Sequence, residues 1–310
     1  MSAARVPSAD VIESLFARYR SQRPIRAASL IVSVFGDTIS VHGGSVWLGS
    51  LIQALAPLGI TERLVRTSVF RLVQDDWLAV ERIGRRSFYR FTAHGHAEYG
   101  RAAERIYAAT SPLWDGRWTL VIPVSVPEGV RDSLRRSLTW LGYGNLANGV
   151  HARPSGDRHA VLALLAELGL RDSVVLMDAE TPSINSESSL ENLVQRCWAL
   201  DELETRYREF ITLFQPLLRN PSRQARMDPE RAFLMRTLLI HEYRRAILHD
   251  PDLPESLLPA RWPGDVARTL TRDLYRELSA SAETFVVDNL QNAQGALPVA
   301  DQDFHQRFGL

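Results

Sequence analysis

The stretch that decides the fold runs from residue 45 to residue 91 and reads SVWLGSLIQALAPLGITERLVRTSVFRLVQDDWLAVERIGRRSFYRF. Apolar side chains at helical spacing follow Ser45, which can cap a helix, and the same pattern follows Thr61. The runs WLAVER and SFYRF then alternate in polarity on either side of the turn at residues 83–86. Such alternation around a glycine-containing turn predicts a β-hairpin.

Helical patterns flank this stretch on both sides. One begins after Pro24 with RAASLIVSVFGDTI, and another runs from about residue 92 to residue 109. Three helices, a hairpin and a further helix form the order of a winged helix-turn-helix. The sequence therefore predicts a winged helix-turn-helix, a DNA-binding domain, over residues 24–110.

The helix after Thr61 has two distinct faces. Val65, Val69 and Leu72 fall within about 60° of one another on a helical wheel, so they form the face that packs inward. The opposite face carries Phe70, which can pack on the hairpin or touch a thymine methyl, and side chains that can donate to base edges and phosphates: Arg63, Arg66, Thr67 and Arg71. The hairpin adds guanidinium groups that suit a phosphate backbone: Arg82, Arg85, Arg86 and Arg90. A solvated surface would explain any one of these residues, but the combination of a basic helix with a basic turn predicts double-stranded DNA as a partner.

The charge distribution supports this prediction although the net charge of the 310-residue chain is zero. Residues 1–110 contain 14 Arg and 9 acidic residues, residues 111–185 contain 7 and 8, and residues 186–310 contain 15 and 19. The positive excess therefore lies in the predicted DNA-binding domain, where phosphate contacts need it. The chain has no lysine, which suits bidentate contacts to phosphate and guanine, although a genome rich in G and C would explain that composition equally well.

The rest of the chain predicts two further domains, in line with its length. Residues 117–180 follow the order strand, helix, strand, strand, helix, strand, which is ferredoxin-like. Residues 188–290 show helical periodicity interrupted by a proline-rich loop, and they predict a mainly helical C-terminal domain. Residues 291–310 show no clear periodicity and are expected to be disordered. The fold class expected for the whole chain is α+β.

Three segments resemble the PaaX family of transcriptional repressors of phenylacetic acid degradation: VFRLVQDDWL (69–78), WDGRW (114–118) and HEYRRAILHDPDLPESLLPARWPG (241–264). The resemblance covers roughly residues 24–288. It implies a Cas2-like fold for the middle domain, a homodimer, and repression of an aromatic catabolic operon that phenylacetyl-CoA relieves. One departure is Asp76, which stands where many winged helices have glycine, and a left-handed helix cap tolerates Asp less well than Gly.

An acyl-CoA effector needs cations for its phosphates and an apolar slot for its acyl group. The C-terminal region has suitable side chains close together in sequence, which predicts an effector site there: His241, Tyr243, Arg244, Arg245 and Trp262. The alternative is a structural role, with the arginines paired to nearby acids and Trp262 packed on the proline-rich loop.

Enzymatic chemistry is not expected. The first strand of the middle domain has no carboxylate for metal-assisted cleavage, and the sequence shows neither a glycine-rich phosphate loop nor a recognisable Ser, His and Asp set. His94 and His96 occupy alternate helix positions, which do not face each other, so we expect neither a metal nor a cofactor.

The single cysteine, Cys197, is expected to be a buried structural thiol of a cytoplasmic protein, and no apolar run is long enough for a membrane partner. Two alternatives to the repressor stay open. One is a module that binds protein through its acidic C-terminal half, and the other is a regulator that answers to a different acyl-CoA or aromatic effector.

Overall fold

The computed structural model describes residues 8–108, 114–147, 149–181, 187–218 and 227–309. These residues divide into two compact units. One unit combines described residues of 1–109, 208–247 and 265–310, and we call it the winged-helix unit. The other combines described residues of 110–207 and 248–264, and we call it the sheet unit. Among the described helices, none is both long and apolar enough to cross a membrane.

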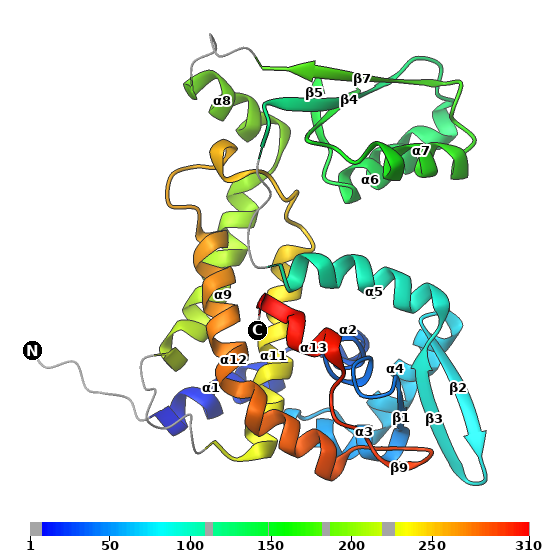
Figure 1. The fold of residues 1–310 in the computed structure, drawn as a ribbon, viewed down its shortest axis with the longest axis vertical. Coiled ribbons are helices and arrows are strands. Elements are labelled where there is room, and N and C mark those ends of the chain that lie inside the picture. The colour runs from blue at the N-terminus through cyan, green and yellow to red at the C-terminus, as the bar shows by residue number, and fades with distance from the viewer. Residues whose placement is uncertain (1–7, 109–113, 148, 182–186, 219–226, 310) are drawn as a thin grey trace, which may run out of the picture. The chain divides into compact units, whose positions relative to one another are not determined.

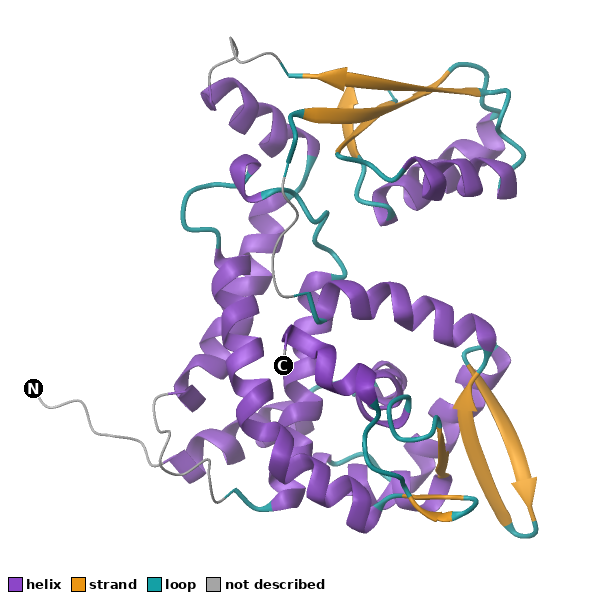
Figure 2. Ribbon diagram, viewed as in Figure 1, coloured by secondary structure: helices purple, strands orange, loops and turns teal. Residues whose placement is uncertain are grey.

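The N-terminal part of the winged-helix unit alternates helices with a small sheet (Figures 1 and 2). Its antiparallel sheet has the strand order β1-β3-β2, so β1 closes the hairpin into three strands. This is the arrangement of a winged helix-turn-helix, and its elements are α1 (Ser8–Ser21), α2 (Ala27–Val34), β1 (Ser45–Trp47), α3 (Leu48–Leu55), α4 (Glu62–Gln74), β2 (Leu78–Ile83), β3 (Arg86–Phe91) and α5 (Ala93–Ile106).

Local signals placed most of these elements well, with one exception. Thr61 caps α4 as predicted, because its hydroxyl accepts a hydrogen bond from the Leu64 amide at 3.3 Å. Ser45 is not a helix cap. It pairs with Arg90 in the sheet, and α3 starts three residues later, after Trp47. Strand β1 has only three residues, which is too short to show a periodicity of its own beside a helical pattern, so it could not be predicted from the sequence.

The C-terminal helices complete the core of the winged-helix unit. They are the second half of α9 (Leu200–Leu218), α11 (Pro229–Ile247) and most of α12 (Pro263–Asn289). Helix α11 packs on α2 and on α5, and nearly all of its apolar side chains are buried. The boundary of 188–290 predicted for a separate C-terminal domain thus differs from this division into compact units, since long-range packing joins these helices to the N-terminal ones.

The end of the chain is ordered, contrary to the expectation for residues 291–310. It forms a short hairpin of β8 (Gln291–Asn292) and β9 (Gly295–Ala296), followed by α13 (Gln302–Gln306). The side chains of Phe304 and Phe308 are buried. Each buried aromatic contributes about 1.5–3 kcal/mol relative to an exposed one, which outweighs the weak local propensity of this segment.

The sheet unit has the predicted ferredoxin-like order. Its four-stranded sheet is antiparallel throughout with the strand order β5-β6-β4-β7. The elements are β4 (Arg117–Pro123), α6 (Glu128–Trp140), β5 (Gly144–Ala147), β6 (Val150–Pro154), α7 (Arg158–Glu167) and β7 (Val174–Glu180), followed by α8 (Glu187–Cys197). Its core lies between the sheet and helices α6 and α7, around Val121, Leu138 and Leu165. The whole chain is therefore α+β, as predicted.

Candidate nucleic-acid interface

Helix α4 presents the basic face that its sequence predicted. Its inward side chains, Val65, Val69 and Leu72, are buried together with Ser68. The opposite face is exposed and carries Arg63, Arg66, Thr67, Phe70 and Arg71. The Phe70 side chain is 61% exposed, so it is available to contact another molecule.

Two of these side chains already have local partners. Arg66 pairs with Glu62 one turn earlier, with its Nη2 at 2.7 Å from Oε1. Both side chains are more than half exposed, so this pair is weak and a phosphate or base could replace it. The Thr67 hydroxyl donates to the Arg63 carbonyl at 2.9 Å, which leaves its oxygen lone pairs available to accept from a base edge.

The hairpin carries a second group of cations at its tip. Ile83 pairs with Arg86 across a two-residue turn, and Gly84 takes a φ of +59° as the first central residue requires in a type II′ turn. Arg82 and Arg85 are exposed there, and neither guanidinium group forms a hydrogen bond or ion pair with any described residue.

Arg86 differs from its neighbours on the hairpin because it is held in place. Its guanidinium lies 4.5 Å from the centroid of the Trp47 ring, and its Nη1 donates to the Gln291 side chain at 3.4 Å. The contact joins β1, the hairpin and the C-terminal segment, so Arg86 supports the orientation of the hairpin as well as its charge.

Asp76 occupies the left-handed position that ends α4, with a φ of +55°. The Asp76 amide donates to Val73 and the Trp77 amide donates to Leu72, at 3.2 and 2.8 Å, which is the Schellman pattern. The Thr92 hydroxyl also donates to the Asp76 carbonyl. The departure from glycine noted in the sequence thus leaves the helix end and its cap intact.

The five residues predicted to bind an effector belong to two different compact units. His241, Tyr243, Arg244 and Arg245 lie on α11 in the winged-helix unit, whereas Trp262 belongs to the sheet unit and packs edge-to-face on Tyr207. The structure thus places them in different surroundings, and their role as effector ligands stays a prediction.

His241 and Arg244 both face α2. The His241 Nδ1 lies 3.3 Å from the Ser33 hydroxyl, and Arg244 Nη1 approaches the same hydroxyl at 3.5 Å. Burial, and then the positive charges of Arg244 and Arg245, lower the pKa of His241 to about 3, so its ring is neutral at physiological pH.

Tyr243 and Arg245 point elsewhere. The Tyr243 ring is buried 5.5 Å from the ring of Phe210, and Arg245 pairs with Glu242 at 2.7 Å. The structural alternative raised by the sequence, in which an arginine pairs with a nearby acid, is therefore observed for Arg245.

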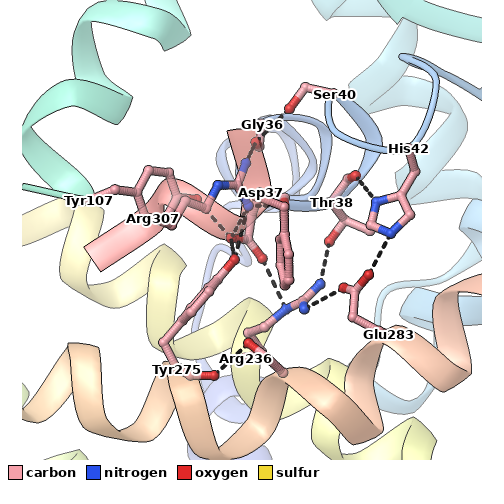
Figure 3. Close-up of polar contacts among 12 residues, drawn as sticks. Gly36, Asp37, Thr38, Ser40, His42, Tyr107, Arg236, Tyr275, Glu283 and Arg307 are labelled. Carbon is pink, nitrogen blue, oxygen red and sulfur yellow. Dashed lines mark hydrogen bonds and ion pairs between the residues drawn. The ribbon is translucent and has the colours of Figure 1, made fainter. Parts of the chain in front are cut away.

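The most concentrated polar chemistry in the winged-helix unit is a buried ionic cluster that the sequence analysis missed (Figure 3). Asp37 lies in the π-helical turn Phe35–Ile39 and forms two ion pairs. Its Oδ2 is 3.2 Å from Arg236 Nε, and its Oδ1 is 3.3 Å from Arg307 Nη1. Arg236 also pairs with Glu283, with Nη1 at 2.6 Å from Oε1. We call Asp37, Arg236, Glu283 and Arg307 the ionic cluster.

Neutral groups satisfy most of the remaining hydrogen bonds of the ionic cluster. The hydroxyls of Tyr107 and Tyr275 donate to Asp37 Oδ1 at 2.7 and 3.0 Å. Arg307 donates to two backbone carbonyls, those of Gly36 and Asp37. His42 lies between the Thr38 carbonyl and the Glu283 carboxylate, at 2.6 and 2.7 Å (Figure 3).

The pKa shifts of Glu283 and Arg236 agree with charged forms of both side chains. Burial alone would raise the pKa of Glu283, but the hydrogen bond from His42 and the charge of Arg236 lower it to about 2. Burial would likewise lower the pKa of Arg236, but Asp37, Tyr275 and Glu283 raise it above its ordinary value. Two guanidinium groups and two carboxylates therefore compensate one another in an interior where an unpaired charge is very costly.

The sequence contained one weak sign of this cluster. Arg236 interrupts the apolar run FLMRTLLI, and Asp37 interrupts VFGDTI, so two charges stand where helical periodicity predicts core positions. Arg307 had no such sign because it lies in the segment expected to be disordered. A partner about 200 or more residues away cannot be inferred from local spacing.

These observations place the chain in the class of multi-domain proteins with a winged helix whose exposed helix and hairpin are basic. Three family models match it: "PaaX-like protein" over residues 26–95, "PaaX protein central Cas2-like domain" over 111–191 and "PaaX-like protein C-terminal domain" over 198–288. The chain belongs to the PaaX family.

Similar proteins agree with this membership. The chain is 42% identical over 287 residues to a protein of Escherichia coli (strain K12) named transcriptional repressor PaaX, covering 92% of this chain and 91% of that protein. A solved structure of an uncharacterized protein from Mycobacterium tuberculosis, Rv0674, shares the fold with a TM-score of 0.54 and 24% identity. That likeness covers 82% of this chain and 95% of the other.

Proposed function

We propose that this protein is a transcriptional repressor that binds double-stranded operator DNA as a homodimer, with α4 in the major groove and the hairpin on the phosphate backbone. The observation that carries the proposal is the exposed face of α4, where arginines and Thr67 have no role in the core. The E. coli relative, which is named a transcriptional repressor, supports the same function.

The operator would be a palindrome in the promoter region of an aromatic, phenylacetate-degrading operon. The family resemblance supports this target. In a two-fold dimer, each α4 would meet one half-site, because the symmetry of the protein is mirrored in its DNA.

Two substitutions separate base reading from backbone binding. Arg66→Ala should relax sequence preference by about 1–3 kcal/mol if Arg66 reads a base. Arg85→Ala, at the hairpin tip, should weaken all sequences alike and flatten the salt dependence. Arg18→Ala is the control, because Arg18 is exposed on α1, away from α4 and the hairpin.

Fluorescence anisotropy with operator and random DNA at several salt concentrations measures both effects. If Arg66→Ala and Arg85→Ala lose affinity equally on both DNAs, the assignment of the α4 face is wrong. If neither differs from Arg18→Ala, the winged helix serves another partner, such as a protein.

The proposed effector is phenylacetyl-CoA, which would release the DNA. The family resemblance supports the ligand, and the packing of α11 on α2 and α5 supports a physical link to the winged helix. The burial of His241 and Tyr243 favours a role for them in transmitting the response over direct contact with the effector. Release requires that the effector bind the DNA-free conformation more tightly, and a coupling of about 1–3 kcal/mol is usual.

Operator binding with and without the thioester tests this part of the proposal. Phenylacetyl-CoA should lower operator affinity about 5- to 150-fold, whereas free phenylacetate, which lacks phosphates, should do much less. If Arg245 leaves Glu242 to hold a phosphate of the thioester, Arg245→Ala should keep DNA binding and lose the response; if the phosphates are held elsewhere, the response should persist. If phenylacetyl-CoA leaves operator affinity unchanged in the unsubstituted protein, the effector is a different molecule.

A further inference from the structure

The sheet unit contains a cavity of 480 Å³ that none of the predicted site residues lines. Its walls come from α6, β5, β6, the junction of α8 with α9, and residues 248–251. The volume lies within the range of about 300–1,000 Å³ that small-molecule sites usually have. The chemistry of its lining therefore decides what it could hold.

Three guanidinium groups line this cavity, those of Arg135, Arg136 and Arg206. Arg206 forms no hydrogen bond or ion pair with any described residue. Arg136 Nη2 reaches only the Ser133 hydroxyl, at 3.4 Å, and Arg135 pairs loosely with the exposed Asp132 at the same distance. Exposed pairs of this kind contribute about 0–1 kcal/mol, so an anion with several oxygens can displace them.

Acidic groups cancel this charge only in part. Two acids line the cavity, Glu202 and Asp250. Asp250 is engaged within the unit, because it accepts hydrogen bonds from the Tyr207 hydroxyl at 2.6 Å and from the Asp252 amide at 2.7 Å. The lining therefore has an excess of guanidinium groups, which suits an anionic ligand.

A buried polar group also faces this cavity. The His151 side chain is only 5% exposed, and its Nδ1 has no hydrogen-bond partner among the described residues. Buried polar atoms are nearly always satisfied, so this nitrogen needs a hydrogen-bond partner, which a ligand or a water molecule in the cavity would supply. Burial, followed by the charge of Arg135, lowers the pKa of His151, so its ring is neutral and can donate or accept.

Two tryptophan rings, those of Trp140 and Trp198, also line the cavity. Trp140, the last residue of α6, is 54% exposed, whereas Trp198 is buried and its Nε1 donates to the Gly142 carbonyl at 3.1 Å. The Trp198 ring lies against Gly144, where a Cβ would meet it at 2.5 Å, so this wall is fixed. An exposed tryptophan beside a fixed wall offers a face on which a planar ring can stack.

We propose that this cavity binds a nucleotide-like ligand, with phosphates on Arg135, Arg136 and Arg206, a planar ring on Trp140, and a polar group on His151. The inference rests on the proposed function in one respect, because it assigns the nucleotide part of the proposed thioester effector to this cavity.

The only cysteine of the chain lines the same cavity and provides a reporter. Cys197 is partly exposed, in contrast to the buried structural thiol that its sequence predicted. Burial raises the pKa of its thiol, and Arg196 opposes this by less, so modification is best followed in mildly alkaline buffer. A ligand in the cavity should shield Cys197 from a thiol reagent.

The experiment titrates the full-length protein with coenzyme A, phenylacetyl-CoA and adenosine 3′,5′-bisphosphate while it measures affinity by calorimetry and the modification rate of Cys197. We expect coenzyme A to slow modification several-fold. Arg206→Ala should weaken coenzyme A binding about tenfold or more, as the loss of a charge-assisted contact usually does. Arg171→Ala, an exposed arginine of the same unit outside the cavity lining, should bind normally.

The outcomes separate this inference from the proposed function. If phenylacetyl-CoA binds and releases DNA but neither protects Cys197 nor depends on Arg206, the cavity is not its site and the inference is overturned. If coenzyme A protects Cys197 in an Arg206-dependent manner and operator affinity does not change, the site stands and the proposed release of DNA fails. If none of the three ligands binds, the inference is overturned as well.

Discussion

Substitution of Asp37 by asparagine should lower the free energy of unfolding of the winged-helix unit by about 3–5 kcal/mol. The change keeps the size of the side chain but removes the charge that both Arg236 and Arg307 contact, at 3.2 and 3.3 Å. Asp37 and Arg236 are at most 1% exposed, so solvent cannot replace the lost carboxylate. Asparagine can still accept from Tyr107 and Tyr275, so the loss is mainly electrostatic.

The expected magnitude follows from these distances. Two opposite charges about 3 Å apart attract by roughly 5 kcal/mol at an effective dielectric constant of about 20, before the cost of desolvation is subtracted. Removal of one member of a buried pair destabilises proteins by about 3–5 kcal/mol, because the other charge is left uncompensated. Whole domains are stable by only about 5–15 kcal/mol, so the variant should be close to unfolding.

Hydrogen exchange of the α11 amides measures this locally, which matters because a two-unit chain need not unfold in one step. The control is Glu98→Gln, which removes the carboxylate of an i,i+3 pair with the exposed Arg101 and should cost less than about 1 kcal/mol. Glu283→Gln provides a milder variant if Asp37→Asn does not fold, since the Glu283 side chain is 20% exposed. A loss of unfolding free energy below about 1 kcal/mol for both Asp37→Asn and Glu283→Gln would refute the reasoning, because a buried charge without a partner destabilises a protein by more than that.

Further predictions concern packing, pH and the DNA face. Gly36→Ala should lower the melting temperature strongly, since its Cβ would meet the Tyr99 ring at about 2 Å, whereas Gly100→Ala on α5 has open space and should not; equal melting temperatures would contradict this. The pKa of His241 is about 6.5 in the unfolded chain and about 3 in the folded protein. Between these two values only the unfolded chain binds the proton, so the free energy of unfolding should fall as the pH drops through that range. The loss of unfolding free energy due to His241 is about 2 kcal/mol between pH 6.5 and pH 5, and His241→Gln should abolish it. His151 contributes a loss of the same sign in both the unsubstituted protein and the variant. Phe70→Ala should weaken operator binding without changing the melting temperature, because its side chain is 61% exposed; an unchanged affinity would remove Phe70 from the interface.

The sequence was sufficient where the determinants are local. The cap at Thr61, the inward stripe of α4 and the turn around Gly84 each depend on residues within a few positions of one another. The left-handed end of α4 could also be placed, because helix ends have a fixed relation to the residues just before them. The predicted DNA-contacting residues accordingly lie exposed on two neighbouring elements of the chain.

The sequence was insufficient where long-range packing decides. Proximity along the chain suggested that His241 to Arg245 and Trp262 share a pocket, yet side chains at successive helix positions point in different directions. His241 faces Ser33 on α2 while Tyr243 contacts Phe210 on α9, so the same four-residue segment serves two different neighbours. The order of the C-terminal segment depends on Phe304 and Phe308 entering a core built by distant helices, for which its own periodicity is no guide.

Long-range packing also bears on how an effector could reach the operator. Helix α2 packs against α4, which carries the proposed DNA-contacting face, and also against α11, which carries His241 and Arg244. Close-packed interiors change between discrete arrangements and do not deform continuously, so a shift of α11 would be passed through α2 to the angle of α4. The ionic cluster adds to this link, because Asp37 follows α2 directly and contacts Arg236 on α11. A signal that moves α11 would therefore act on the same core that positions the basic face, and if operator DNA binds that face as proposed, reciprocity requires that it bias the position of α11.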